Sequence, residues 1–202
     1  MKLYISTISI AVVIICAANI AFGIASPYYV IAATVWCVAL QFALDGAVAI
    51  TVNKMPDRYF LPDNRAFRIS DFEKNLYKSL QVRRWKDKVW ELGSLGGFSK
   101  RTLSEPDNPE YIRKFIIECN KGVTTHRLSY PIGFLAMLTL SGVCTLTVAI
   151  PVATVNLILN VLPTIVLRYN TPKLFAVLRR LERKGGQRAG AAASDAKEGA
   201  TR

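Results

Sequence analysis

The sequence predicts an all-α membrane protein with four transmembrane helices, arranged as two helical hairpins on either side of a charged, helical middle segment. The prediction rests on the position of the charges, because residues 3–44 and 128–167 contain no Asp, Glu, Lys or Arg. A helix rises about 1.5 Å per residue, so roughly forty residues cover about 60 Å, twice the hydrocarbon core of a bilayer. Each apolar block is therefore long enough for two spans.

The first hairpin is expected over residues 1–52, with spans at 3–25 and 28–52. Pro27 marks its turn, since proline starts a helix well but disrupts a helix interior. A cleaved signal peptide is the competing interpretation of this N-terminus, which has one basic residue ahead of a long apolar run. We expect a retained span.

The second hairpin is expected over residues 128–167, with spans at 128–146 and 149–167. Its turn is less sharply marked than the first. Gly142 and Pro151 are the two residues near the middle of this block that interrupt helices most readily.

Basic residues set the expected orientation. Of the 26 Lys and Arg residues, 16 lie in residues 53–127 and nine lie from Arg168 onward, whereas the two predicted turns carry none. Short loops rich in Lys and Arg stay on the cytoplasmic side of a membrane. We therefore expect a multi-pass protein of the cell (inner) membrane, with both termini and the middle segment in the cytoplasm.

The net charge of +12 raises the question of a nucleic-acid partner. Basic residues beside membrane spans are better explained by anionic lipid headgroups, which attract each of them by about 1 kcal/mol. We expect membrane lipids as partners, with no nucleic acid, and a membrane-protein partner or a homo-oligomer as further options. The four cysteines show no CxxC pair, so we expect neither a metal site nor a bound cofactor.

The middle segment, residues 53–127, carries two helix start signals. Ser70, followed by Glu73 three residues later, forms a capping box and predicts a helix over residues 71–90. A second helix is predicted from Asn108 and Pro109, a cap followed by proline at the first helical position. Apolar residues follow at helical spacing in the second helix, at Ile112, Phe115, Ile116, Cys119 and Val123.

The C-terminal part begins at Arg168. Residues 168–185 predict a basic amphipathic helix on the membrane surface, opened by Pro172 and ended by the Gly185-Gly186 pair. The Ala, Gly and Ser-rich residues 186–202 are expected to be disordered.

Four pieces of sequence occur in a familiar order: MPDRYF at residues 55–60, FEKNLYKSLQVRRWKDK at 72–88, FIIECNKGVTTH at 115–126, and LPTIVLRYNTPKLFAVLRRLERKGGQR at 162–188. Together they resemble the glycosyl-4,4'-diaponeurosporenoate acyltransferase family of small membrane acyltransferases. The resemblance implies a membrane-bound enzyme that moves a fatty acyl group from an acyl thioester, such as acyl-CoA, to a hydroxyl of a lipophilic, glycosylated acceptor.

Acyl transfer to a hydroxyl needs a base, and His126 is the single histidine of the chain. An unperturbed imidazole titrates near pH 6.5, so His126 is the candidate general base; an interfacial histidine bonded to a backbone carbonyl is the alternative. Glu118 is its candidate orienting partner. Eight residues of unbroken helix separate the two by about 12 Å, so direct contact requires a break, for which Gly122 is the obvious place.

Other polar residues suggest binding roles. Arg83, Arg84, Trp85 and Lys86 are candidates for gripping donor phosphates or, alternatively, lipid headgroups. Asp45 lies inside a predicted span, where a charge is costly, so it is a candidate acceptor-binding or headgroup-binding residue.

Further polar groups lie in or beside the second and fourth predicted spans. Arg168, Tyr169 and Asn170 are candidates for headgroup binding at the interface, with simple membrane anchorage as the alternative. Gln41 lies one turn before Asp45, and Asn156 lies one turn before Asn160; the asparagines are expected to bond between spans.

The resemblance thus implies an O-acyltransferase, and the distribution of basic residues places it at the inner membrane face. The rival prediction, from a different class, is a noncatalytic subunit that binds lipid or scaffolds a membrane complex. Replacement of His126 discriminates between the two.

Overall fold

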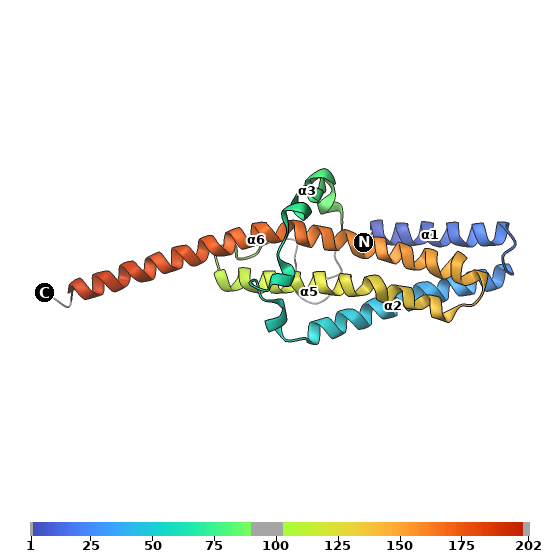
Figure 1. The fold of residues 1–202 in the computed structure, drawn as a ribbon, viewed down its shortest axis with the longest axis horizontal. Coiled ribbons are helices and arrows are strands. Elements are labelled where there is room, and N and C mark those ends of the chain that lie inside the picture. Colours follow the sequence, from blue (N-terminus) through green and yellow to red (C-terminus); the bar gives the residue numbers. More distant parts are fainter. Residues whose placement is uncertain (1, 90–102, 200–202) are drawn as a thin grey trace.

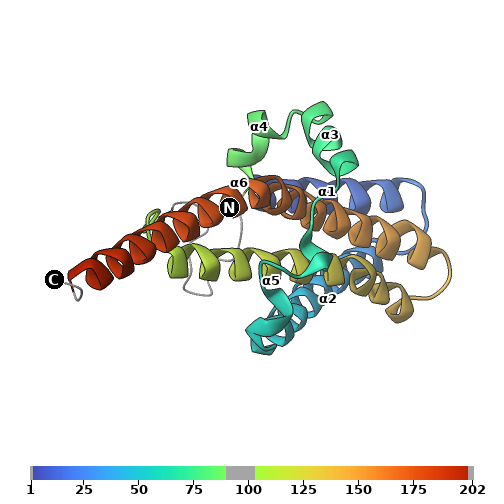
Figure 2. The same cartoon turned by 60° about the vertical axis from the view of Figure 1, so that its left-hand side comes forward.

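The computed structural model describes residues 2–89 and 103–199, with side chains for 4–89 and 103–187, and all of its regular elements in these ranges are helical (Figure 1). Helix α1 (Lys2–Ala21) turns back into α2 (Pro27–Lys54), and α5 (Pro109–Gly133) turns back into α6 (Ile150–Gly199). The four helices lie side by side over much of their length (Figures 1 and 2). The all-helical prediction is confirmed for the described residues.

Three helical stretches in the described residues are long and apolar enough to cross a membrane, at Tyr4–Ala21, Pro27–Lys54 and Thr145–Gln187. The predicted span at 128–146 is not among them. It consists of the end of α5, a 3₁₀-helical segment (Phe134–Thr139) and a turn before a π-helical turn (Thr145–Ala149). Pro131 inside α5 and Gly142, with a left-handed φ of 61°, explain the interruption. The four-span arrangement stays a prediction.

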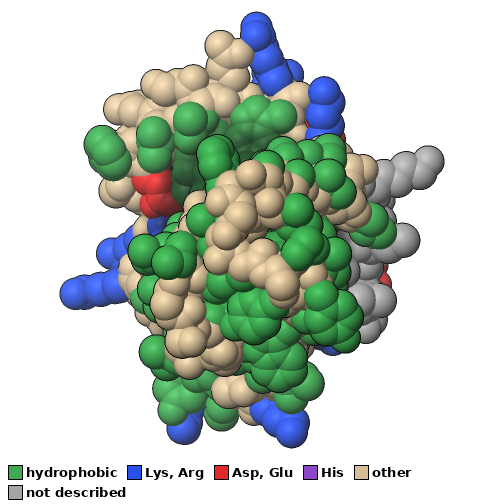
Figure 3. All heavy atoms as spheres, turned by 90° about the vertical axis from the view of Figure 1, so that its right-hand side faces the viewer, with side chains coloured by type: hydrophobic (Ala, Val, Ile, Leu, Met, Phe, Trp, Pro, Cys, Tyr) green, Lys and Arg blue, Asp and Glu red, His purple; other side chains and the backbone are tan. Residues whose placement is uncertain are grey.

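The turn between α1 and α2 forms where the sequence places it. Ser26 caps α2 by accepting a hydrogen bond from the Tyr29 N–H, at 3.4 Å, and Pro27 follows at the first helical position. Figure 3 views the molecule from the end that carries both inter-helix turns. Hydrophobic side chains are prominent on this face, and Lys and Arg side chains lie at its edge.

Helix α5 begins as predicted. The Asn108 side chain accepts hydrogen bonds from the backbone N–H groups of Glu110 and Tyr111, and the predicted apolar stripe is buried. This stripe forms one hydrophobic cluster with side chains of α2 and α6, among them Val52 and Leu174. A second, separate cluster lies near the α1–α2 turn and includes Ile15, Cys37, Val148 and Val152.

The predicted helix over residues 71–90 is wrong in its extent. It divides into α3 (Asp71–Ser79), α4 (Val82–Trp85) and a 3₁₀ turn (Lys86–Lys88), and residue 90 lies outside the described residues. Gln81 breaks the helix because its φ of 49° is left-handed. The Trp85 indole N–H donates to the carbonyl of Leu80 at 2.9 Å, which satisfies an acceptor at the break.

Ser70 caps α3 as predicted, accepting from the Glu73 N–H at 3.1 Å. The Glu73 carboxylate instead binds the Arg168 guanidinium of α6 through both oxygens, with an Nη2–Oε2 distance of 2.6 Å, and accepts a hydrogen bond from the Tyr77 hydroxyl. Burial acts to raise the pKa of Glu73, but the hydrogen bonds from Arg168 and Tyr77 and the Arg168 charge outweigh it, so the pKa is lowered. The Glu73–Arg168 pair ties α3 to the bundle.

Helix α6 crosses two boundaries that the sequence suggested. It continues through Pro172, where a separate surface helix was expected to start, and through Gly185-Gly186, where a helix end and a disordered tail were expected. Thr171 does not act as a cap; its hydroxyl donates to the Leu167 carbonyl at 2.9 Å, within the helix. Glycine disfavours a helix by only about 1 kcal/mol, and alanines follow the pair, so the helix continues to Gly199.

Replacing Glu73 with Gln should lower the free energy of unfolding at neutral pH by about 3–5 kcal/mol, because the buried Arg168 would lose its carboxylate partner. The folded pKa is lowered, so the pair stabilises the fold above the unfolded value near 4.3 and is lost as pH falls through the folded value. Glu73→Gln should therefore lack this acid sensitivity. Thermal unfolding in detergent at several pH values measures both effects.

The matched control is Asp71→Asn, two residues away on the same helix. The Asp71 side chain is 92% exposed and pairs with Lys74, so its replacement should change the unfolding temperature far less. Equal losses in the two variants would contradict the structural role of the Glu73–Arg168 pair.

Candidate functional site

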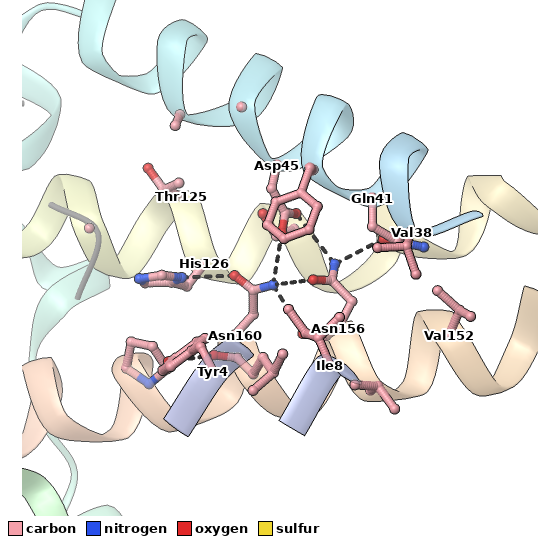
Figure 4. A pocket seen from close by; sticks show the side chains of 18 of the residues that line it. Tyr4, Ile8, Val38, Gln41, Asp45, Thr125, His126, Val152, Asn156 and Asn160 are labelled. Atoms are coloured by element: carbon pink, nitrogen blue, oxygen red, sulfur yellow. Dashed lines mark hydrogen bonds between the residues drawn. The ribbon is translucent and has the colours of Figure 1, made fainter. Parts of the chain in front are cut away.

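A cavity of about 730 Å³ lies among α1, α2, α5 and α6, between the two hydrophobic clusters (Figure 4). Its volume is within the range of small-molecule sites, about 300–1,000 Å³. Each of the four helices contributes one face to its wall. From α5 these residues are Glu118, Lys121, Gly122, Thr125, His126 and Ser129, at spacings of three and one.

A directed chain of side-chain amides crosses the cavity wall and ends at His126 (Figure 4). The Gln41 amide N–H donates to the Gly133 carbonyl at 2.6 Å, and the Gln41 oxygen accepts from Asn156 at 2.9 Å. The Asn156 oxygen accepts from Asn160 at 3.2 Å. The Asn160 oxygen in turn lies 2.8 Å from Nδ1 of His126.

The direction of this chain fixes the proton position on the imidazole. A backbone carbonyl can only accept, so the Gly133 carbonyl orients Gln41, and each amide then orients the next. Asn160 is left with its oxygen toward His126, which therefore donates from Nδ1–H. In this neutral tautomer the basic lone pair is on Nε2.

Asp45 imposes the same direction independently. Its carboxylate oxygens lie 3.4 Å from the Asn156 amide nitrogen and 3.3 Å from the Asn160 amide nitrogen. A carboxylate accepts hydrogen bonds, so both amide N–H groups must face Asp45 and the Asn160 oxygen must face His126. Asp45 thus acts on His126 through Asn160, from a different helix.

Close packing holds the far end of the amide chain. A Cβ atom at Gly133 would lie 2.9 Å from the Gln41 side-chain oxygen and 3.1 Å from the Asn156 amide nitrogen. Glycine at this position therefore lets α5 approach the two amides closely enough for its carbonyl to bind Gln41.

The two ends of the cavity differ in polarity. At one end Lys121, 9% exposed, pairs with Asp57 at 2.6 Å and with Glu118 at 3.4 Å. Burial acts to lower the pKa of Lys121, but the Asp57 hydrogen bond and both carboxylate charges outweigh it and raise the pKa. At the other end the wall is apolar and includes Ile15 and Val38.

The structure brings three predicted site residues, His126, Glu118 and Asp45, to one cavity. It does not bring Glu118 into contact with His126. Helix α5 runs unbroken through Gly122, so the eight-residue separation stays about 12 Å. The Glu118 carboxylate binds Lys121 instead, and Asn160 takes the place expected for Glu118 beside the imidazole.

The other predicted binding residues do not line the cavity. Arg83 and Arg84 are exposed on α4, Trp85 binds the Leu80 carbonyl, and Lys86 pairs with Asp87 at 2.5 Å. These positions are compatible with contacts to phosphates at the membrane surface.

The residues around Arg168 have structural contacts. Arg168 is 4% exposed and held by Glu73, so its placement does not support headgroup binding or snorkelling. Tyr169 packs edge-on against Tyr77 and under the Lys173 ammonium, and Asn170 is half-buried in the same helix.

Two residues of the site were not singled out from the sequence. Lys121 and Ser129 lie on the cavity face of α5, and the Ser129 hydroxyl is buried without a hydrogen-bond partner among the described residues. The sequence did carry a signal for both residues. Lys121 lies three residues after Glu118 and Ser129 lies three residues after His126, a spacing that places each pair on one face of a helix. Within the described residues, no three His, Cys, Asp or Glu side chains are grouped to hold a metal ion.

Comparison with known proteins identifies one family. A family model described as glycosyl-4,4'-diaponeurosporenoate acyltransferase matches residues 57–180, more than half of the chain. The matched range includes His126 and Asn160, whereas α1 and α2, with Asp45, lie outside it. No curated protein and no solved structure significantly matches the chain.

The assigned tautomer can be tested directly because His126 is the single histidine. Nitrogen NMR of the ¹⁵N-histidine-labelled protein, at a pH where the ring is neutral, should show a protonated Nδ1 and an unprotonated Nε2. Asn160→Leu should weaken this preference, since it removes the acceptor of the Nδ1–H bond. A neutral ring protonated at Nε2 in the unaltered protein would contradict the assignment.

Proposed function

This chain belongs to the glycosyl-4,4'-diaponeurosporenoate acyltransferase family, and on that premise we propose that it transfers a fatty acyl group from an acyl thioester to a sugar hydroxyl of a glycosylated carotenoid or a similar lipophilic acceptor. The observation that carries this proposal is a histidine of fixed tautomer in the wall of a cavity with one apolar and one polar end. An acyl thioester such as acyl-CoA also has one apolar and one polar end: the acyl chain is apolar, the carrier thiol (coenzyme A) is polar, and the reactive carbonyl lies between them.

His126 acts as the general base. Its Nε2 takes the proton of the acceptor hydroxyl while the hydroxyl oxygen forms a bond to the thioester carbonyl carbon. The resulting tetrahedral intermediate collapses, the C–S bond breaks, and the protonated imidazole returns its proton to the departing thiolate. The products are the ester and the free thiol.

Asp45 and Asn160 are positioning residues in this step. Asn160 holds the Nδ1–H of His126, and the Asp45 carboxylate orients the Asn160 amide. The Asn160 amide thus lies between the Asp45 carboxylate and the His126 imidazole. Asn160 and Asp45 together orient the imidazole, the role that we expected for Glu118.

The polar end of the cavity faces the carrier of the donor. Lys121 supplies a positive charge there, although its two carboxylate partners offset that charge. The exposed Arg83 and Arg84 stand outside the cavity, where they bind either the phosphates of acyl-CoA or anionic lipid headgroups.

Replacing His126 with Ala or Gln should lower kcat for acyl transfer by about 10²–10⁴, the usual contribution of a general base, without loss of folding in detergent. The assay follows ester formation from acyl-CoA and glycosyl-4,4'-diaponeurosporenoate by mass spectrometry. Arg113→Gln is the control, because Arg113 lies on the same helix but pairs with Glu182 away from the cavity.

Turnover that survives in both His126 variants would overturn the assignment of the base. An unaltered protein that binds lipid or a membrane partner but makes no ester would instead favour the noncatalytic alternative.

We also propose that both termini and the middle segment face the cytoplasm of the cell, as the distribution of basic residues predicts. In a variant with the native cysteines replaced by alanine, a cysteine introduced at the exposed Asp107 should react with a membrane-impermeant maleimide only after the inner face is opened. A cysteine at Phe22, 82% exposed at the α1–α2 turn, should react from outside. The reverse pattern would contradict the proposed orientation.

A further inference from the structure

Three side chains from three helices lie at the apolar end of the cavity. Ile15 of α1, Val38 of α2 and Val152 of α6 all line it, and Ile15 and Val152 are 8% and 6% exposed. Behind them lies the second hydrophobic cluster, completed by Ala33, Cys37, Val148 and Ala149. Packed side chains therefore set a floor to the cavity at this end.

The distance from this floor to the reacting centre can be measured along α6. Val152 marks the floor, and Asn160, eight residues later, holds His126. Eight residues of helix correspond to about 12 Å. The wall along this distance is mainly aliphatic and aromatic, as with Ile8 and Phe42, and its two amides, Gln41 and Asn156, already bind each other.

We propose that this apolar end holds the acyl chain of the donor and that Ile15, Val38 and Val152 limit the length of chain that the protein accepts. The inference rests on the proposed function, since it places the thioester carbonyl beside His126. A flexible saturated chain can adapt to a space of bounded depth. The rigid polyene of a carotenoid is far longer than about 12 Å and cannot fold into it, so the acceptor enters by another side.

Substitutions at the floor should change chain-length preference in opposite directions. Val152→Phe makes the cavity shallower. The kcat/KM for long saturated acyl-CoAs, divided by that for short ones, should therefore fall about tenfold or more, because one methylene in an apolar pocket changes kcat/KM by about that factor. Val152→Ala deepens the cavity toward Cys37 and Val148, and the same ratio should rise.

Val13→Phe is the matched control. Val13 lies on α1 but is 65% exposed and does not line the cavity, so the same enlargement there should leave the preference unchanged. The full-length protein in detergent is given a mixture of saturated acyl-CoAs with glycosyl-4,4'-diaponeurosporenoate, and the product esters are counted by mass spectrometry.

A second measurement does not depend on turnover. The affinity for each acyl-CoA can be measured from the thermal stabilisation that it produces. This affinity should rise about fourfold with each added methylene until the chain reaches the floor, and should then stop rising. This limit should move to shorter chains in Val152→Phe. If ester formation fails in every protein but the limit still moves, the proposed function fails and the chain-binding inference stands.

Three results would overturn the inference. The length limit could stay the same in active, folded Val152 variants, or the change could appear in the choice of acceptor rather than of donor. The control Val13→Phe could also shift the preference as much as Val152→Phe does.

Discussion

A charged group inside an apolar helix bundle must be given its hydrogen bonds by the protein, because lipid supplies none. Asp45 sits in the middle of α2, and the amides of Asn156 and Asn160 on α6 face its carboxylate. Gln41, one turn earlier, links α6 to the Gly133 carbonyl of α5. These bonds fix how α2, α5 and α6 lie against one another, since a shift of any helix would leave a buried polar group without a partner.

The same bonds set the chemistry. They hold His126 in the tautomer with a basic Nε2, next to a cavity that separates polar from apolar surface. The family match begins at residue 57, so it covers His126 and Asn160 but not α1 and α2. The N-terminal hairpin contributes Asp45 and much of the apolar wall. Both the orientation of His126, through Asp45, and the apolar end of the cavity, through Ile15 and Val38, therefore draw on this hairpin together with α6.

Local signals in the sequence predicted where helices start, but they predicted poorly where helices end and which residues contact one another between helices. Ser70 and Asn108 cap helices as expected because a cap depends on its nearest neighbours. Pro172 failed as a boundary although proline costs a helix interior about 3 kcal/mol, because Leu167, Leu174 and Leu178 on either side of it are packed in the hydrophobic cluster. Gly185 failed because glycine costs a helix only about 1 kcal/mol. Likewise, His126 was identified by its chemistry, but its partner was not. Glu118 is near in sequence, whereas Asn160 reaches His126 only through the packing of α5 on α6. The i, i+4 pairs Gln41–Asp45 and Asn156–Asn160, polar residues one turn apart in apolar blocks, were the available signal.

The central claim, that the cavity beside His126 holds the acyl group, is tested most directly by photocrosslinking. An acyl-CoA with a diazirine near the end of its chain would be bound and irradiated, and the labelled peptides sequenced by mass spectrometry. The account predicts labels on residues that line the cavity, such as Ile8, Val155 and Leu159, and their suppression by unlabelled acyl-CoA. Labels confined to outward-facing residues such as Ile14 and Ile31, with none in the cavity, would contradict it.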